Sequence, residues 1–127
     1  MDKSTLVVSD YEAGKALLHA LDQAGVEVKA AFWLYLSEPD EWRLHLALPE
    51  VAEKGPREGY ERVQGILEQS QLEGLSLMNI TVIAPDNNLV RLLRSVIRTG
   101  PGIAGIRLRG NVIDNVLIED AYIYRTM

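Results

Sequence analysis

Residues 28–48 read VKAAFWLYLSEPDEWRLHLAL, and this stretch decides the fold. Two runs rich in apolar and aromatic residues, 28–37 and 42–48, flank the turn-prone segment EPDE at 38–41. Strand-like runs joined by a short segment containing proline and aspartate are typical of a β-hairpin. The sequence therefore predicts two neighbouring antiparallel strands here.

The register of this hairpin decides which side chains share a face, because successive residues of a strand point to opposite faces. A turn with an odd number of residues places Phe32 and the leucines of both runs on one apolar face, whereas an even number mixes the two sets. We expect the odd turn, since it yields a single apolar face. The opposite face then carries Lys29, Trp33, Tyr35, Arg43 and His45.

These five side chains form one candidate binding surface. Aromatic and basic groups on an open sheet suit contact with a protein or with stacked bases. The alternative is that a helix covers this face, in which case Trp33 and Tyr35 belong to a second core layer.

Three amphipathic helices are predicted around the hairpin. Ser9 and Glu12 match a capping box for a helix over residues 10–24. A second helix begins at Pro56, and a third follows Pro85, with Asp86 or Asn87 as its cap. The buried stripe of the third helix is expected to comprise Leu89, Leu92, Leu93, Val96 and Ile97.

The remaining β-rich segments complete the topology. Residues 6–8 are a short candidate strand, residues 77–84 are apolar enough for a central strand, and residues 103–109 and 116–124 read as a C-terminal pair. The order (β)αββαβαββ predicts an α+β fold in a single domain, 1–127, with a mixed β-sheet and three amphipathic helices.

Composition excludes several classes of protein. The chain has 127 residues, 47% hydrophobic and 24% charged, with a net charge of −5 and no cysteine. A disulfide framework, a thiolate zinc site and a cysteine nucleophile are therefore excluded. No apolar run approaches the roughly 20 residues of a membrane span, and the start MDKST lacks a signal-peptide core. We expect a cytoplasmic protein without a membrane partner.

Charge is distributed unevenly along the chain. Residues 1–73 hold 14 acids and 7 bases, net −7, whereas residues 74–127 hold 4 acids and 6 bases, net +2. All six bases of the second part are arginines. Such an asymmetry favours a binding partner.

The arginines form the second candidate binding surface. Three of them repeat at helical spacing on the third predicted helix, and two alternate on the following strand, so that all five border one surface if that strand packs beside the helix. Guanidinium groups bind carboxylates and phosphates in bidentate geometry. The alternative is a solvated helix face with strand arginines paired to acidic neighbours. The five residues are Arg91, Arg94, Arg98, Arg107 and Arg109.

Catalytic motifs are weak. Residues 100–105 match G-x-G-x-x-G, but they follow a helix and precede a strand, which is the reverse of the dinucleotide-binding order. Asp114, Glu119 and Asp120 are carboxylates of the kind that binds divalent cations, but adjacent strand residues point to opposite faces. We expect no catalytic residues, no metal site and no cofactor.

The sequence thus predicts a small non-catalytic protein that acts through protein–protein contact, by self-association as a homo-oligomer or with a dedicated partner. The alternative is a nucleic-acid-binding module or metal-dependent nuclease that uses the arginine cluster. The net charge of −5 disfavours nucleic acid, because domains that bind it are usually basic.

Overall fold

The computed structural model describes residues 4–72 and 74–127. The elements, in chain order, are α1 (Val8–Gln23), β1 (Ala30–Leu36), β2 (Glu41–Ala47), α2 (Pro49–Lys54), α3 (Pro56–Gln69), the 3₁₀ turn η1 (Leu77–Asn79), β3 (Ile80–Ile83), α4 (Asn88–Val96), β4 (Ile106–Ile113) and β5 (Val116–Thr126). The fold is α+β on one mixed sheet, as predicted, with the short helix α2 in addition. In the described part of the chain, no helix is both long and apolar enough to cross a membrane.

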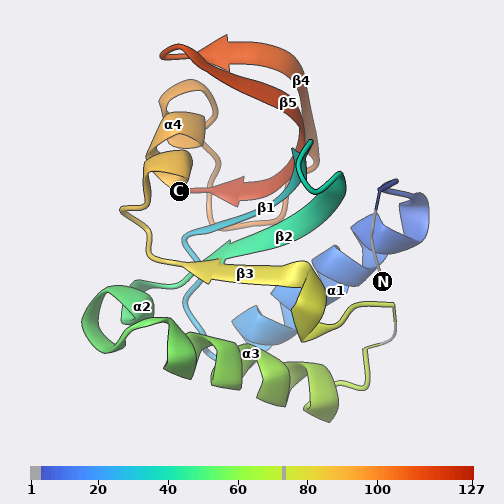
Figure 1. The fold of residues 1–127 in the computed structure, drawn as a ribbon. Coiled ribbons are helices and arrows are strands. Elements are labelled where there is room, and N and C mark those ends of the chain that lie inside the picture. Colours follow the sequence, from blue (N-terminus) through green and yellow to red (C-terminus); the bar gives the residue numbers. More distant parts are fainter. Residues whose placement is uncertain (1–3, 73) are drawn as a thin grey trace.

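The five strands lie in the order β3-β2-β1-β5-β4 (Figure 1). Neighbouring strands are antiparallel except β2 and β3, which are parallel. Residues 77–84 were expected to form a central strand, but they form η1 and the edge strand β3. The edge position explains why a strand of only four residues suffices.

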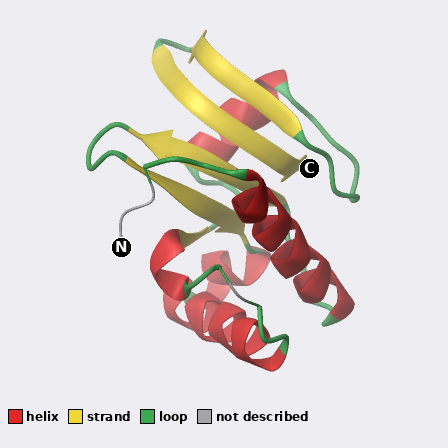
Figure 2. Cartoon of the chain, turned by 90° about the vertical axis from the view of Figure 1, so that its right-hand side faces the viewer, coloured by secondary structure: helices red, strands yellow, loops and turns green. Residues whose placement is uncertain are grey.

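Helices pack on both faces of the sheet (Figure 2). The larger apolar cluster lies on the face covered by α1 and α3 and includes Leu17, Trp33 and Val63. The smaller cluster lies on the face covered by α4 and includes Phe32 and Leu93. The sheet therefore has two buried faces rather than one.

The predicted register of the β1–β2 hairpin is wrong. Trp33 pairs with Leu44, and Phe32 pairs with His45, so the turn between Leu36 and Glu41 contains four residues, an even number. The criterion of a single apolar face fails because helices cover both faces, and each strand must therefore be apolar on both sides.

Helix α1 begins earlier than predicted. The expected strand at residues 6–8 is absent from the described sheet, and Val8 is already helical. The Asp10 carboxylate accepts a hydrogen bond from the Val7 amide at 2.9 Å. It thus satisfies an amide before the first turn, a role that the sequence had assigned to the Ser9 and Glu12 pair.

The β4–β5 hairpin turns at Asp114 and Asn115, which have φ angles of +48° and +67°. Positive φ at both central residues is the geometry of a two-residue type I′ turn, which matches the twist of the flanking strands. Gly110 and Asn111, the other turn-prone pair, lie inside β4. The hairpin is therefore longer than expected and extends over α4 (Figure 1).

Candidate functional site

The arginines of the third predicted helix lie together on α4. The Asn87 side chain accepts a hydrogen bond from the Leu89 amide at 2.9 Å, and this cap fixes where the helix begins. Leu93 is fully buried beneath the helix. Arg91 and Arg94 occupy the opposite side, and Arg98 follows the helix end.

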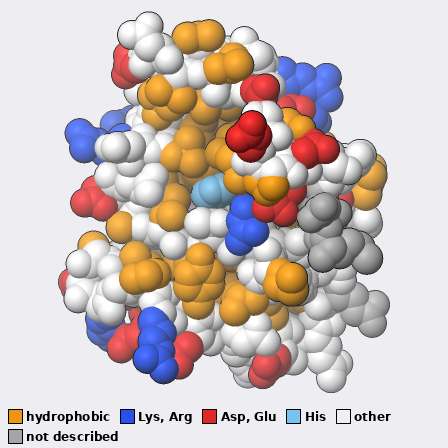
Figure 3. All heavy atoms as spheres, viewed as in Figure 1, with side chains coloured by type: hydrophobic (Ala, Val, Ile, Leu, Met, Phe, Trp, Pro, Cys, Tyr) orange, Lys and Arg blue, Asp and Glu red, His pale blue; other side chains and the backbone are white. Residues whose placement is uncertain are grey.

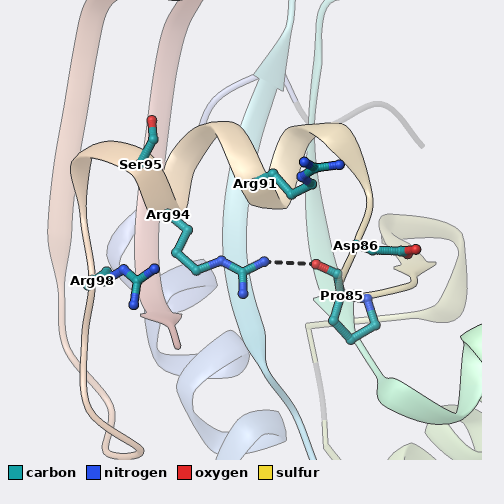
Figure 4. Close-up of a pocket in the computed structure, with 6 residues that line it drawn as sticks. All are labelled: Pro85, Asp86, Arg91, Arg94, Ser95 and Arg98. Carbon is teal, nitrogen blue, oxygen red and sulfur yellow. Dashed lines mark hydrogen bonds between the residues drawn. The ribbon is translucent and has the colours of Figure 1, made fainter.

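These three arginines line one open pocket, which we call the arginine pocket (Figure 4). Its volume is about 620 Å³, and Pro85, Asp86 and Ser95 complete its lining. The Arg94 guanidinium donates a hydrogen bond to the Pro85 carbonyl oxygen at 3.0 Å, which positions it over the loop that precedes the helix. Figure 4 shows the Arg94 and Arg98 side chains extending to the same side of α4.

The three arginines of this pocket differ from most of the other described arginines, because they have no carboxylate partner within the described part of the chain. Within residues 4–72 and 74–127, Arg91, Arg94 and Arg98 form no salt bridge. Even Asp86, which lines the same pocket, is not within salt-bridge distance of them. By contrast, a carboxylate pairs with each of Arg43, Arg62, Arg107, Arg109 and Arg125. The pocket therefore presents guanidinium groups whose donors are available to an external anion.

The predicted convergence of five arginines is wrong. Arg107 and Arg109 share a strand face, as expected, but that face lies opposite α4, because the alternate residues Ile106 and Leu108 pack against the smaller cluster. The Arg107 guanidinium binds both oxygens of Asp120 at 2.6 Å. Arg109 lies 3.6 Å from the same carboxylate.

Arg107 has a structural role instead. It also donates to the Tyr11 hydroxyl at 2.7 Å, and its Cζ atom lies 5.5 Å from the centre of the Trp42 ring. The hydrogen bonds to Asp120 raise the pKa of Arg107 above its usual value. These contacts tie α1 to the two C-terminal strands.

The predicted aromatic hairpin face is also wrong, because the even turn divides its members between the two faces. Trp33 is fully buried on the α1 side, where its indole N–H donates to the Tyr124 hydroxyl at 3.0 Å. Tyr35 lies on the same face, half-buried. Arg43 and His45 lie on the α4 face, and Lys29 precedes β1 and pairs with Glu27.

The His45 side chain is buried on the face of the sheet that α4 covers, beside the smaller cluster. Its ring stacks on Phe32 with 5.1 Å between ring centres, and its Nδ1 lies 3.1 Å from the Arg43 carbonyl oxygen. Burial lowers the pKa of His45 to about 4. The imidazole is therefore neutral at pH 7, with Nδ1 donating to the carbonyl.

We expect His45 to make the protein less stable in mild acid. The unfolded chain binds the proton with a pKa near 6.5 and the folded protein only near 4, so stability is present above pH 6.5 and is lost as the pH falls toward 4. The free energy of unfolding should fall by about 2 kcal/mol between about pH 7.5 and pH 5. Urea denaturation of the wild type and of His45→Gln at both pH values measures this change in the free energy of unfolding. In His45→Gln, most of the difference in stability between the two pH values should disappear.

The exposed His19 on α1 provides the control. His19→Gln should keep the pH dependence of the wild type. If His45→Gln keeps it as well, the burial of a neutral imidazole is not its cause.

The remaining motifs do not form a site. Among the described residues, no group of three or more His, Cys, Asp or Glu side chains could hold a metal ion. Asp120, one member of the carboxylate set considered above, is held by Arg107 and Arg109. The glycine motif at 100–105 lies between the end of α4 and the start of β4, as the sequence predicted.

Sequence reasoning missed the loop that completes the arginine pocket. Pro85 and Asp86 were identified only as a helix start, whereas their loop forms one wall of the pocket. The signal was their position six and five residues before Arg91, just ahead of the helix start, which brings a loop and a helix face together. No protein-family model, curated protein or solved structure matches this chain.

Proposed function

We propose that this is a cytoplasmic, non-catalytic protein that acts by binding another protein, and that the arginine pocket receives an acidic segment of that partner. One observation carries the proposal: three guanidinium groups border one pocket of about 620 Å³ and have no carboxylate partner among the described residues. Arginine is suited to such contacts because its planar donors match carboxylate geometry.

The charge balance favours a protein over a nucleic acid. Without Arg107 and Arg109 the cluster has three members, and residues 1–73 carry a net charge of −7. Binding to a polyphosphate requires several phosphate contacts and is opposed by a protein of the same sign. A second copy is the alternative protein partner, since its own acidic residues 1–73 complement the pocket.

A hexaglutamate peptide is a suitable probe, with affinity measured by calorimetry at low salt. Arg94→Ala should weaken binding about tenfold, which corresponds to about 1.4 kcal/mol. Arg91→Ala and Arg98→Ala should act in the same direction. The matched control is Arg57→Ala on α3, because Arg57 is also exposed and has no salt bridge among the described residues.

Two results would contradict the proposal. The first is an equal loss of affinity in Arg57→Ala, which would indicate a general charge effect. The second is binding to short DNA or RNA that is tighter than binding to the peptide at ~50 mM salt and weakens steeply with added salt. Light scattering decides between the two protein partners: a dimer that Arg94→Ala dissociates identifies the second copy.

A further inference from the structure

A second surface lies on the same side of the sheet as α4, but in a different place. It is a cleft of about 450 Å³ between the turn of the β1–β2 hairpin and the end of the β4–β5 hairpin. Its apolar lining comes from three separate elements and consists of Leu34, Leu36, Leu89, Val116, Leu117 and Ile118. We call it the acidic cleft, for the two glutamates described below.

The apolar part of this cleft continues onto the exposed end of the β4–β5 hairpin. Val116 is 46% exposed and Leu117 is 55% exposed. Val112, the cross-strand partner of Leu117, is 67% exposed. Figure 3 shows hydrophobic side chains gathered in a hollow on this face of the molecule. Exposed apolar side chains gathered beside a cleft are typical of interaction sites.

The charges around the cleft have one sign. Glu38 and Glu119 line it, and none of its described lining residues is a lysine or an arginine. Within the part of the chain that the structure describes, neither glutamate forms a salt bridge. Tyr35, which also lines the cleft, donates a hydrogen bond to Asp40. This bond raises the pKa of Tyr35, with smaller contributions from desolvation and from the charges of Asp40 and Glu119. Among the described residues that line the cleft, the only charged side chains are therefore these two glutamates.

We propose that the acidic cleft binds an amphipathic segment of a partner protein, with apolar side chains in the cleft and lysine or arginine at Glu38 and Glu119. Charge decides the occupant. A second copy would bring the same carboxylates against each other, and like charges brought together oppose association. A basic segment neutralises them and buries the exposed valine and leucine side chains. This inference does not depend on the arginine pocket.

The test compares three 12-residue peptides by calorimetry: alternating Leu/Lys, alternating Leu/Glu and alternating Ser/Lys. The Leu/Lys peptide should bind at least about tenfold more tightly than either of the others. Leu117→Ser should weaken it by about the same factor, and so should the double variant Glu38→Gln, Glu119→Gln. All three substituted side chains are exposed, so the fold should be retained.

Matched controls separate the cleft from a general attraction of basic peptides to an acidic protein. Glu53→Gln combined with Glu61→Gln changes the net charge equally at exposed sites outside the cleft. Val96→Ser removes an exposed valine elsewhere on α4. Both should leave the affinity unchanged, as should Arg94→Ala, which distinguishes this surface from the arginine pocket.

Three outcomes would overturn the inference. They are equal affinity for the Leu/Glu peptide, equal weakening in the Glu53/Glu61 control, and a dimer in light scattering that Leu117→Ser dissociates. The last would show that a second copy occupies the cleft.

Discussion

Replacing Asp22 with alanine is expected to lower the free energy of unfolding by about 3–5 kcal/mol, because it leaves a buried guanidinium without its counter-ion. Arg125 on β5 has only 3% of its side chain exposed. Its Nη1 and Nη2 donate to the two Asp22 oxygens at 3.1 and 2.8 Å. Asp22 itself is partly exposed, but the charge that would be left behind is not.

The position of this pair adds to the effect. The same guanidinium donates to the carbonyl oxygens of Val28 and Gly102, so it joins the end of α1, the approach to β1 and the segment before β4. Urea denaturation of the wild type and Asp22→Ala at pH 7 measures the loss. The control is Glu27→Ala, which removes an exposed partner of Lys29 and should cost less than about 1 kcal/mol. A loss in Asp22→Ala no larger than that of the control would contradict the interpretation.

Leu93→Ala should lower the free energy of unfolding by about 2–5 kcal/mol, because Leu93 is fully buried under α4 and its removal leaves a cavity in the smaller cluster. Val96 lies three residues further along the same helix but is 53% exposed. Val96→Ala should therefore change stability by no more than about 0.5 kcal/mol.

This pair of variants tests the orientation of α4, on which the placement of the arginine pocket depends. Thermal and urea denaturation of both proteins suffice. Equal losses, or a loss below about 1 kcal/mol for Leu93→Ala, would show that the helix buries another side and that the arginines face elsewhere.

The same helix shows what the sequence could and could not predict. Its existence and the burial of Leu93 followed from local signals, and so did its cap, which was expected at Asp86 or Asn87 and is found at Asn87. The edge of the buried stripe could not be predicted in this way. At about 100° per residue, Val90 and Val96 lie about 60° to either side of Leu93, so periodicity alone is compatible with the burial of either valine. The structure buries Val90 and exposes Val96, because the helix already ends at Val96.

The hairpin register failed for a related reason. An alternating pattern identifies a buried face only when the other face meets water, and Phe32 and Trp33 are both fully buried, on opposite faces. Which side chains of the two strands share a face then depends on the length of the turn. That length follows from tertiary packing. Because the predicted register is wrong, Trp33 and His45 do not share a face as expected.

The arginine cluster was half predictable. Alternation placed Arg107 and Arg109 on one face of their strand, and both indeed meet Asp120. Nothing in the local pattern shows which face of the sheet α4 covers, since that depends on how the chain crosses from one layer to the other. The spacing of the helical arginines is local, and the structure places all three at the arginine pocket.

The two-layer core has a practical consequence for spectroscopy. Both tryptophans of the chain, Trp33 and Trp42, belong to the larger cluster, and the smaller cluster contains none among its described members. Intrinsic indole emission therefore reports only on the α1 and α3 layer, while circular dichroism reports on every helix. A variant that loosens α4 alone should lose ellipticity before its emission maximum shifts to longer wavelength, so that non-coincident transitions in these two signals would reveal partial melting of one layer.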